Sequence, residues 1–215
     1  TFSESDWNTS SKVDSGGDYY GYAKVTAERT VQDYKSEHFD AVRILPGINL
    51  GPCMTKAHTK ASAVVVRQML YGNAQPEYQG HFVDVRDTAI AHVRALSWTV
   101  PTDDCRRFIC CIDDAMKVSE LGAPLKRLFP EYKIDAVPRP GPILRGAMGL
   151  PLVWRIFMNS FERAMAFQEF RLENARVKDV LGVSFRSLDE TLRDTVKSMV
   201  ETGFVKPRVL RVDPV

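Results

Sequence analysis

The apolar positions of this 215-residue chain follow two alternating patterns. Some segments repeat apolar residues at helical spacing, and the shorter apolar runs between them are typical of buried strands. The pattern predicts helices over 19–36, 59–70, 88–97, 118–128 and 187–201, and strands over 41–45, 81–85, 108–112 and 134–137. Helices and strands that alternate in this way indicate layered α/β architecture.

Local signals mark where several of these elements begin and end. Pro46-Gly47 follows the first predicted strand and breaks it. Asp87 precedes the helix predicted over 88–97, and its side chain can cap that helix. The last predicted helix opens with a capping box, Ser187-Leu188-Asp189-Glu190, and Gly203 ends it.

Composition narrows the class of protein only slightly. Hydrophobic residues make up 44% of the chain and charged residues 26%, as in an ordinary soluble globular protein. The net charge of +2 favours neither a nucleic acid nor a strongly acidic partner, so we expect no nucleic-acid binding. The most apolar segment, 143–161, is interrupted by Arg145, Pro151 and Arg155, so we also expect no membrane span.

The cysteines lack the C-x-x-C spacing of metal and redox sites, and no residue pattern predicts a metal site. The four are Cys53, Cys105, Cys110 and Cys111. Two of them are adjacent within a predicted buried strand, so free buried thiols are the expected state. Free thiols indicate a reducing compartment, and we expect a cytoplasmic location, with an organelle as the alternative.

Tyr20 and Lys24 carry the clearest candidate chemistry. They lie four residues apart near the start of the helix predicted over 19–36, so both side chains project from one helix face. An ammonium beside a phenol favours the phenolate by charge attraction, which suits the phenol to general acid–base work. By spacing alone, a half-buried aromatic residue and a solvated Lys on an amphipathic helix is the commoner arrangement.

A resemblance that runs along almost the whole chain favours the chemical interpretation. Five blocks occur in the order found in dihydroflavonol reductases and cinnamoyl-CoA reductases. They are E-S-D-W at 4–7, D-Y-Y-G-Y-A-K with A-E at 18–28, P-G-I-N-L-G-P at 46–52, F-V-D-V-R-D with A-H at 82–92, and L-G-x-x-F-R-S-L-D-E-T-L at 181–192. The chain thus resembles that branch of the extended short-chain dehydrogenase/reductases, the NAD-dependent epimerase/dehydratase superfamily.

The resemblance implies the C-terminal portion of a Rossmann-like, doubly wound parallel sheet, together with a smaller mixed α/β substrate domain. It divides the chain into 1–52 with the catalytic helix, 53–80 as a substrate-domain excursion, 81–112 as the return to the sheet, and 113–215 mainly as substrate domain. The sequence has no G-x-x-G-x-x-G turn for the dinucleotide pyrophosphate. The family's catalytic Ser/Thr also matches no position, so we expect an N-terminal half, or another subunit, to complete the protein.

The implied reaction is the reduction of a small carbonyl substrate by NADP or NAD, with NADP favoured. In it Tyr20 donates the proton, Lys24 holds the nicotinamide ribose, and the loop Pro46-Gly47-Ile48 lies against the nicotinamide. The chain is therefore expected to belong to an enzyme that is inactive without its nucleotide-binding half. The alternative is a structural or assembly subunit that keeps a degenerate reductase fold.

Other polar residues have plainer interpretations. Asp84, Arg86 and Asp87 are expected to organise a strand-to-helix junction by capping and an ion pair. Neither His58 nor His92 has metal-ligand spacing, and neither is expected to be catalytic.

Two remaining features each have an expected role and an alternative. Surface solvation is the expected state of Lys56 and Arg67, with a substrate carboxylate or cofactor phosphate as the alternative. The segment 138–170 is expected to supply helices of the substrate domain. Its alternative role is an interfacial or partner-binding surface anchored by Trp154, Phe157 and Phe161.

Overall fold

A computed structural model of the chain describes residues 1–13, 18–34, 38–73, 78–99, 105–134 and 169–207. The helices in these ranges are α1 (Tyr19–Asp33), α2 (Val64–Leu70), α3 (Val85–Leu96), α4 (Gly122–Leu128), α8 (Ala175–Leu181) and α9 (Leu188–Glu201), with 3-10 turns η1 (His58–Lys60) and η2 (Val118–Leu121). The strands are β1 (Arg43–Pro46), β2 (Ile48–Leu50), β3 (Gln79–Asp84), β4 (Arg107–Cys110) and β5 (Ala115–Lys117).

The strands form two small sheets that share one stretch of backbone. β1 pairs in parallel with β4, and the chain then continues through Gly47 into β2, which pairs in parallel with β3. The backbone N–H of Gly47 donates to the Cys110 carbonyl at 3.0 Å, so the change of partner occurs at this residue. β5 completes the second sheet, antiparallel to β3.

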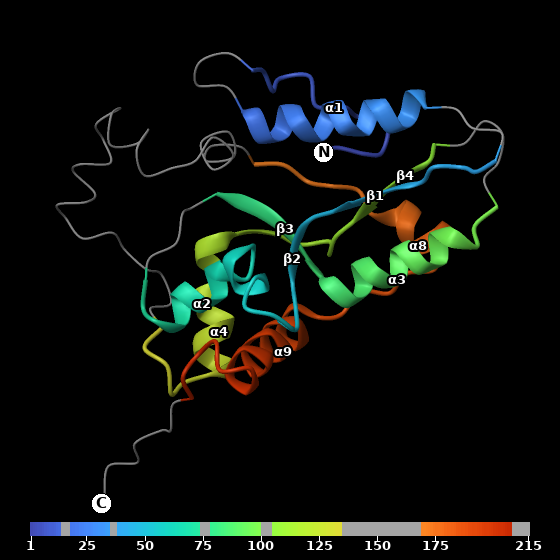
Figure 1. The fold of residues 1–215 in the computed structure, drawn as a ribbon. Coiled ribbons are helices and arrows are strands. Elements are labelled where there is room, and N and C mark those ends of the chain that lie inside the picture. The colour runs from blue at the N-terminus through green and yellow to red at the C-terminus, as the bar shows by residue number, and fades with distance from the viewer. Residues whose placement is uncertain (14–17, 35–37, 74–77, 100–104, 135–168, 208–215) are drawn as a thin grey trace, which may run out of the picture.

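Helices cover both faces of the β1–β4 pair. In Figure 1, α1 lies above these strands, and α3 and α8 lie below them. Contacts of α3 with β1 and of α8 with β4 close the lower face around a core of buried residues. That core contains Val83, Ala91, Phe108, Cys110, Val177, Leu181 and Val183. By contrast, α1 has no buried residue, so polar contacts rather than a hydrophobic core hold it over the sheet.

The larger core lies around the second sheet. α2, α4 and α9 pack together there, and α9 also contacts β2 and β3. Its fully buried side chains include Val66, Leu70, Leu121, Leu125, Leu192 and Met199. Hydroxyls on α9 fix the loop that follows β2, because Thr195 Oγ1 accepts from Gly51 N and Ser198 Oγ accepts from Cys53 N, each at 2.8 Å.

Side chains satisfy the outer edge of β4: Ile109 N donates to Glu4 Oε1 at 3.0 Å, and Asn174 Nδ2 donates to the Cys111 carbonyl at 2.6 Å. Arg176 Nη2 donates to the Cys105 carbonyl, also at 2.6 Å. Among the described residues, β4 is the only strand that pairs with β1.

The junction between β3 and α3 is built as expected in part. Asp84 accepts from Arg86 N at 2.9 Å and pairs with the Arg86 guanidinium, which also reaches Asp194 of α9 at 2.7 Å. Burial by itself would raise the pKa of Asp84, but hydrogen bonds from Arg86 and Thr191 hold that pKa below its usual value. The expectation that Asp84 and Arg86 organise this junction is confirmed.

The expected cap at Asp87 is wrong. α3 begins at Val85, with Asp84 as its N-cap, so Asp87 lies inside the first turn. Its side chain is fully buried, accepts from Arg186 N at 2.8 Å and forms an ion pair with the Arg186 guanidinium. This residue therefore joins α3 to the segment that leads into α9.

Several predicted elements differ at their ends. α1 ends at Asp33, the helix predicted over 59–70 divides into η1 and α2, and Ile134 lies in no strand. The short elements β2, β5 and α8 were not predicted. The rest of the strand at 134–137 and nearly all of 138–170 lie outside the described residues. Within the described ranges, no helix combines the length and the hydropathy needed to cross a bilayer.

The buried pair of Asp87 and Arg186 leads to a prediction about stability. Asp87→Ala should lower the free energy of unfolding by about 3–5 kcal/mol, because it leaves a half-buried guanidinium and a backbone N–H without their partner. Asp189→Ala, which breaks the exposed pair with Arg127, should cost less than about 1 kcal/mol. Urea unfolding of both variants measures the difference, and equal losses would contradict the assignment.

Candidate functional site

The start of α1 is fixed by one carboxylate. Asp18 Oδ1 accepts from Gly21 N at 2.9 Å and caps the helix, while Oδ2 accepts from Ser11 Oγ at 2.8 Å. A Cβ on Gly21 would lie 2.0 Å from Asp18 Oδ2, so a larger residue there would force the capping side chain to shift. The cap thereby joins the N-terminal segment to the helix that carries the candidate pair.

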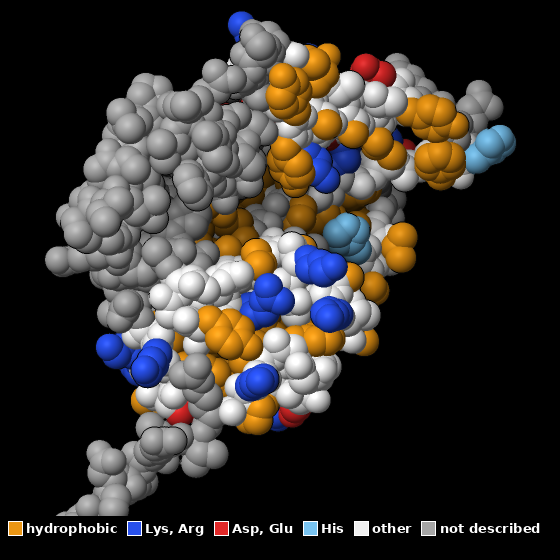
Figure 2. Space-filling model, turned by 60° about the vertical axis from the view of Figure 1, so that its left-hand side comes forward, with side chains coloured by type: hydrophobic (Ala, Val, Ile, Leu, Met, Phe, Trp, Pro, Cys, Tyr) orange, Lys and Arg blue, Asp and Glu red, His pale blue; other side chains and the backbone are white. Residues whose placement is uncertain are grey.

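Tyr20 and Lys24 lie one turn apart on α1. Lys24 Nζ is 5.4 Å from the centre of the Tyr20 ring, within the range of a cation–π contact. The Tyr20 side chain is 54% exposed. Figure 2 shows hydrophobic and aromatic side chains gathered on the upper part of the molecule, where Figure 1 places α1.

A cavity of about 730 Å³ lies beside the start of α1. Its floor is the carboxyl ends of β1 and β4, at Leu45, Pro46 and Ile109. The N-terminal segment 2–11, Asp18 and the segment around Phe170 form its walls. Clefts at the carboxyl ends of parallel strands are the usual ligand sites of open α/β sheets, and this volume suits a small organic ligand.

The predicted site residues are divided between this cavity and its surroundings. Pro46 lines the cavity, whereas Tyr20 and Lys24 follow Asp18 along α1 and are not among the residues that line it. Ile48 packs against the larger core and covers Gly80. The assignment of these residues to catalysis and cofactor binding remains a prediction.

Gly47 has a structural reason to be glycine. A Cβ at this position would lie 2.3 Å from the His81 carbonyl oxygen and 3.2 Å from the Cys111 Cβ. The close approach comes from the change of strand partner between β1 and β2. Packing against β3 therefore accounts for this glycine without a ligand.

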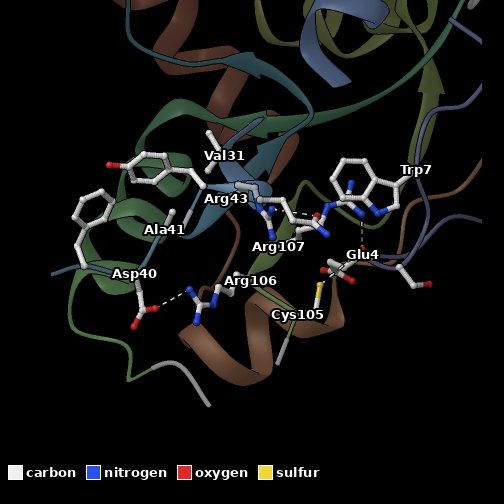
Figure 3. A pocket seen from close by; sticks show the side chains of 13 residues that line it. Glu4, Trp7, Val31, Asp40, Ala41, Arg43, Cys105, Arg106 and Arg107 are labelled. Atoms are coloured by element: carbon white, nitrogen blue, oxygen red, sulfur yellow. Dashed lines mark hydrogen bonds and ion pairs between the residues drawn. The ribbon is translucent and has the colours of Figure 1, made fainter. Parts of the chain in front are cut away.

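The sequence did not predict Arg107 as a residue of the candidate site. Its guanidinium, on β4, lies 4.0 Å from the centre of the Trp7 ring and pairs with Glu28 of α1 at 2.6 Å. Nη1 also donates to the carbonyls of Glu4, which Figure 3 draws, and of Asp6. The available signal was a charged residue in an otherwise apolar strand.

His81 was also missed, and it fixes one wall of the cavity. Its Nε2 accepts from Leu172 N at 3.2 Å, and its Nδ1 lies 3.3 Å from the Ile112 carbonyl. Nε2 also lies 3.3 Å from the Phe170 carbonyl, so the ring contacts backbone groups on both sides. The ring also lies 5.6 Å from that of Phe170, so it positions the two apolar side chains that line the cavity.

The other candidates have structural roles. His58 Nδ1 accepts from Met54 N, and His92 Nδ1 lies 2.8 Å from the Thr88 carbonyl.

All four cysteines are free, and burial raises the pKa of Cys110 to about 11 and that of Cys111 to about 12. Lys56 is exposed and Arg67 half-buried. In the part of the chain that the structure describes, no group of His, Cys, Asp and Glu could hold a metal ion.

Comparisons with known proteins identify relatives. No protein-family model matches the chain. It is 30% identical to cinnamoyl-CoA reductase 1 of Arabidopsis thaliana over 207 residues, which cover 95% of this chain and 52% of that protein. It is 27% identical to the NADPH-dependent methylglyoxal reductase GRE2 of Saccharomyces cerevisiae over 217 residues, which cover 94% of this chain and 57% of that protein.

Solved structures show the same fold. Yeast methylglyoxal/isovaleraldehyde reductase Gre2 in complex with NADPH superposes with a TM-score of 0.68 at 23% identity, over 94% of this chain and 58% of that one. A nucleoside-diphosphate-sugar epimerase from Pseudomonas aeruginosa gives a TM-score of 0.66 at 16% identity, over 93% of this chain and 60% of that one. The predicted Rossmann-like α/β fold is confirmed.

The resemblance inferred from the five sequence blocks is confirmed as well. The relatives that the chain matches in sequence include cinnamoyl-CoA reductases and the methylglyoxal reductase GRE2. The chain spans about half the length of the curated relatives that it matches.

The packing of Gly47 gives the second prediction. Gly47→Ala should destabilise the chain by about 1–3 kcal/mol, because its Cβ must displace the His81 carbonyl or the strand itself. Pro46→Ala, at the neighbouring exposed position, should cost less than about 1 kcal/mol. Thermal and urea unfolding test this, and a fully stable Gly47→Ala variant would show that the close approach is not structural.

Proposed function

We propose that the chain carries the proton-transfer and substrate side of an NADPH-dependent reductase that converts a small aldehyde or ketone to an alcohol. The observation that carries the proposal is the Tyr20–Lys24 pair on α1, whose cap Asp18 lines a cavity at the carboxyl ends of two parallel strands. The named relatives support the reaction class, since they are reductases of cinnamoyl-CoA and of methylglyoxal.

Tyr20 is the proposed proton donor. Reduction of a carbonyl places negative charge on its oxygen, and a phenol within hydrogen-bond reach can neutralise that charge as it develops. Lys24, whose ammonium lies beside the same ring, stabilises the phenolate that remains. Asp18 keeps both side chains in place because it fixes the first turn of α1.

The cavity selects the substrate by its walls. Leu45, Ile109, Phe170 and Leu172 give it an apolar surface, and the hydroxyl-rich segment 8–11 borders it on the other side. An organic carbonyl compound with an apolar group fits this combination better than a highly charged substrate. His81 contributes indirectly, because it holds the segment that carries Phe170 and Leu172.

The described residues suit only one end of NADPH. When bound, this cofactor supplies the hydride that reduces the carbonyl carbon. Lys24 and Pro46 would hold the nicotinamide-riboside end. The three longest described helices begin beside Asp18, Asp84 or the pair Asp189 and Glu190, and such carboxylates oppose a pyrophosphate at those N-termini. The pyrophosphate therefore needs a Gly-rich turn that this sequence does not contain.

A structural subunit is the second candidate function. Its support is the same sequence without a G-x-x-G-x-x-G turn, combined with a helix α1 that buries none of its residues. A subunit of this kind would keep the fold without turning over a substrate. Reductase assays separate the two candidates.

The catalytic assignment gives the third prediction. In the protein as its gene encodes it, Tyr20→Phe should lower turnover of aldehydes and ketones with NADPH by about 10²–10⁴-fold, because the proton donor is lost. Lys24→Met should lower turnover and weaken cofactor binding together. Steady-state kinetics over a panel of aldehydes and ketones measure both effects.

Tyr22→Phe is the matched control for this experiment. Tyr22 is an exposed tyrosine on the same helix that has no part in the proposed proton transfer, and its variant should keep wild-type kinetics. If Tyr20→Phe were as active as this control, the catalytic assignment would be lost. An inactive but folded wild-type protein, assayed with both NADPH and NADH, would favour the structural subunit.

The missing pyrophosphate site gives the fourth prediction. Residues 1–215 by themselves should not bind NADPH or NADH with micromolar affinity, because only contacts to the nicotinamide-riboside end are present. Calorimetric titration of the purified chain tests this. Micromolar binding by a monodisperse monomer would place the cofactor site elsewhere in the chain.

A further inference from the structure

A second cavity, of about 520 Å³, lies at the opposite ends of the same strands. It opens where β1 and β4 begin, at Arg43 and at Arg106-Arg107, whereas the candidate active site lies where these strands end. Trp7 and Arg107 line both cavities, so their stacked side chains form the wall between them. Figure 3 shows Arg43 and Arg107 close together in this second cavity, whereas Arg106 points toward Asp40.

Arg43 is the charged residue of this cavity whose hydrogen-bond donors are incompletely satisfied. Among the described residues, its buried Nε has no hydrogen-bond partner, and its Nη1 donates to Gln32 Oε1 at 3.3 Å. Burial is the largest effect on the pKa of Arg43 and lowers it, and the neighbouring Arg107 and Arg106 charges act in the same direction. Arg43 as a whole is half-buried, but a buried N–H without an acceptor is costly, and an anion could supply that acceptor.

The nearby acidic groups are already engaged. Asp40 pairs with Arg106 at 2.6 Å, and Glu28 pairs with Arg107 at 2.6 Å, although its charge also reaches Arg43. Glu4, the remaining acidic residue of the lining, accepts a hydrogen bond from Ile109 N at the edge of β4. Within the described part of the chain, none of these carboxylates forms an ion pair with the guanidinium of Arg43.

The rest of the wall is aromatic and apolar. Tyr34 and Phe39 stack with ring centres 5.8 Å apart at 20°, yet they are 61% and 58% exposed. Trp7 and Val31 line the same space. The cavity therefore offers flat apolar surfaces beside one guanidinium that lacks an acidic partner, and a guanidinium fork matches a carboxylate in geometry.

We infer that this second cavity is a binding site for a small aromatic carboxylate, whose carboxylate pairs with Arg43 and whose ring packs against Tyr34 and Phe39. The site is separate from the proposed reductase centre and does not depend on that function. Its volume lies within the range of small-molecule sites. The ligand would supply the acceptor that Arg43 Nε lacks.

Calorimetric titration of the chain with three probes tests the inference. Benzoate should bind at a single site, benzamide should bind at least about tenfold more weakly because it has no charge, and acetate should also bind more weakly because it has no ring. Arg43→Met should weaken benzoate binding by about 10- to 100-fold, the usual worth of a hydrogen-bonded ion pair. Arg193→Met, at an exposed arginine on α9, is the matched control and should bind benzoate as the wild type does.

Unfolding temperatures show whether an Arg43 variant that binds benzoate more weakly is still folded. Arg43→Met should unfold at the same temperature as the wild type or a higher one, because it removes a buried polar atom without a partner. If that variant failed to fold, Arg43→Lys would decide, since it keeps the charge without the planar fork and should bind benzoate more weakly. Equal benzoate binding by the wild type and the decisive Arg43 variant, or equal binding of benzoate and benzamide, would overturn the inference.

Discussion

The ion pair between Arg107 and Glu28 holds together the parts of the molecule that carry the candidate site. Arg107 belongs to β4, Glu28 belongs to α1, and the same guanidinium holds the N-terminal segment through two carbonyls and Trp7. Because α1 buries no side chain, hydrophobic packing cannot replace this contact. The position of Tyr20 and Lys24 relative to the sheet therefore depends largely on a buried charge whose three nitrogens are all hydrogen-bonded, the condition under which such a charge is tolerated.

The same residue links two cavities with different chemistry. On one side of Arg107 and Trp7 lies an apolar cavity at the carboxyl ends of the strands, and on the other lies a cavity with a poorly satisfied Arg43. Parallel strands make this arrangement possible, because all their carboxyl ends meet at one edge of the sheet and all their amino ends at the other. A ligand at either end would contact the same stacked pair of side chains.

Local signals in the sequence predicted most of the long elements. The capping box at Ser187 and the stop at Gly203 set the ends of α9 within one turn, because both act through neighbouring backbone groups. Periodicity likewise predicted α1 and α3, since each is longer than ten residues. The five sequence blocks predicted the family and the fold more specifically than any of these local signals.

What the sequence could not predict depends on contacts between distant segments. β2 and β5 are three residues each, too short for a pattern, and they exist because β3 offers a partner. The sequence predicted the wrong role for Asp87, a helix cap, because its actual partner Arg186 lies 99 positions away. His81 and Arg107 were invisible for the same reason: each satisfies backbone carbonyls or amides that only the folded chain brings near.

The strand that passes through Gly47 has a consequence for the dynamics of the whole chain. β1 and β2 are successive parts of one strand, so each of the two sheets loses a member if this backbone detaches from its partners. Opening of one sheet at Gly47 would therefore disturb the other, and we expect their amide hydrogens to exchange with solvent as one cooperative unit. A domain boundary placed at Gly47 would divide the chain into a nucleotide-binding part and a substrate-binding part. Both parts would still belong to one folding unit.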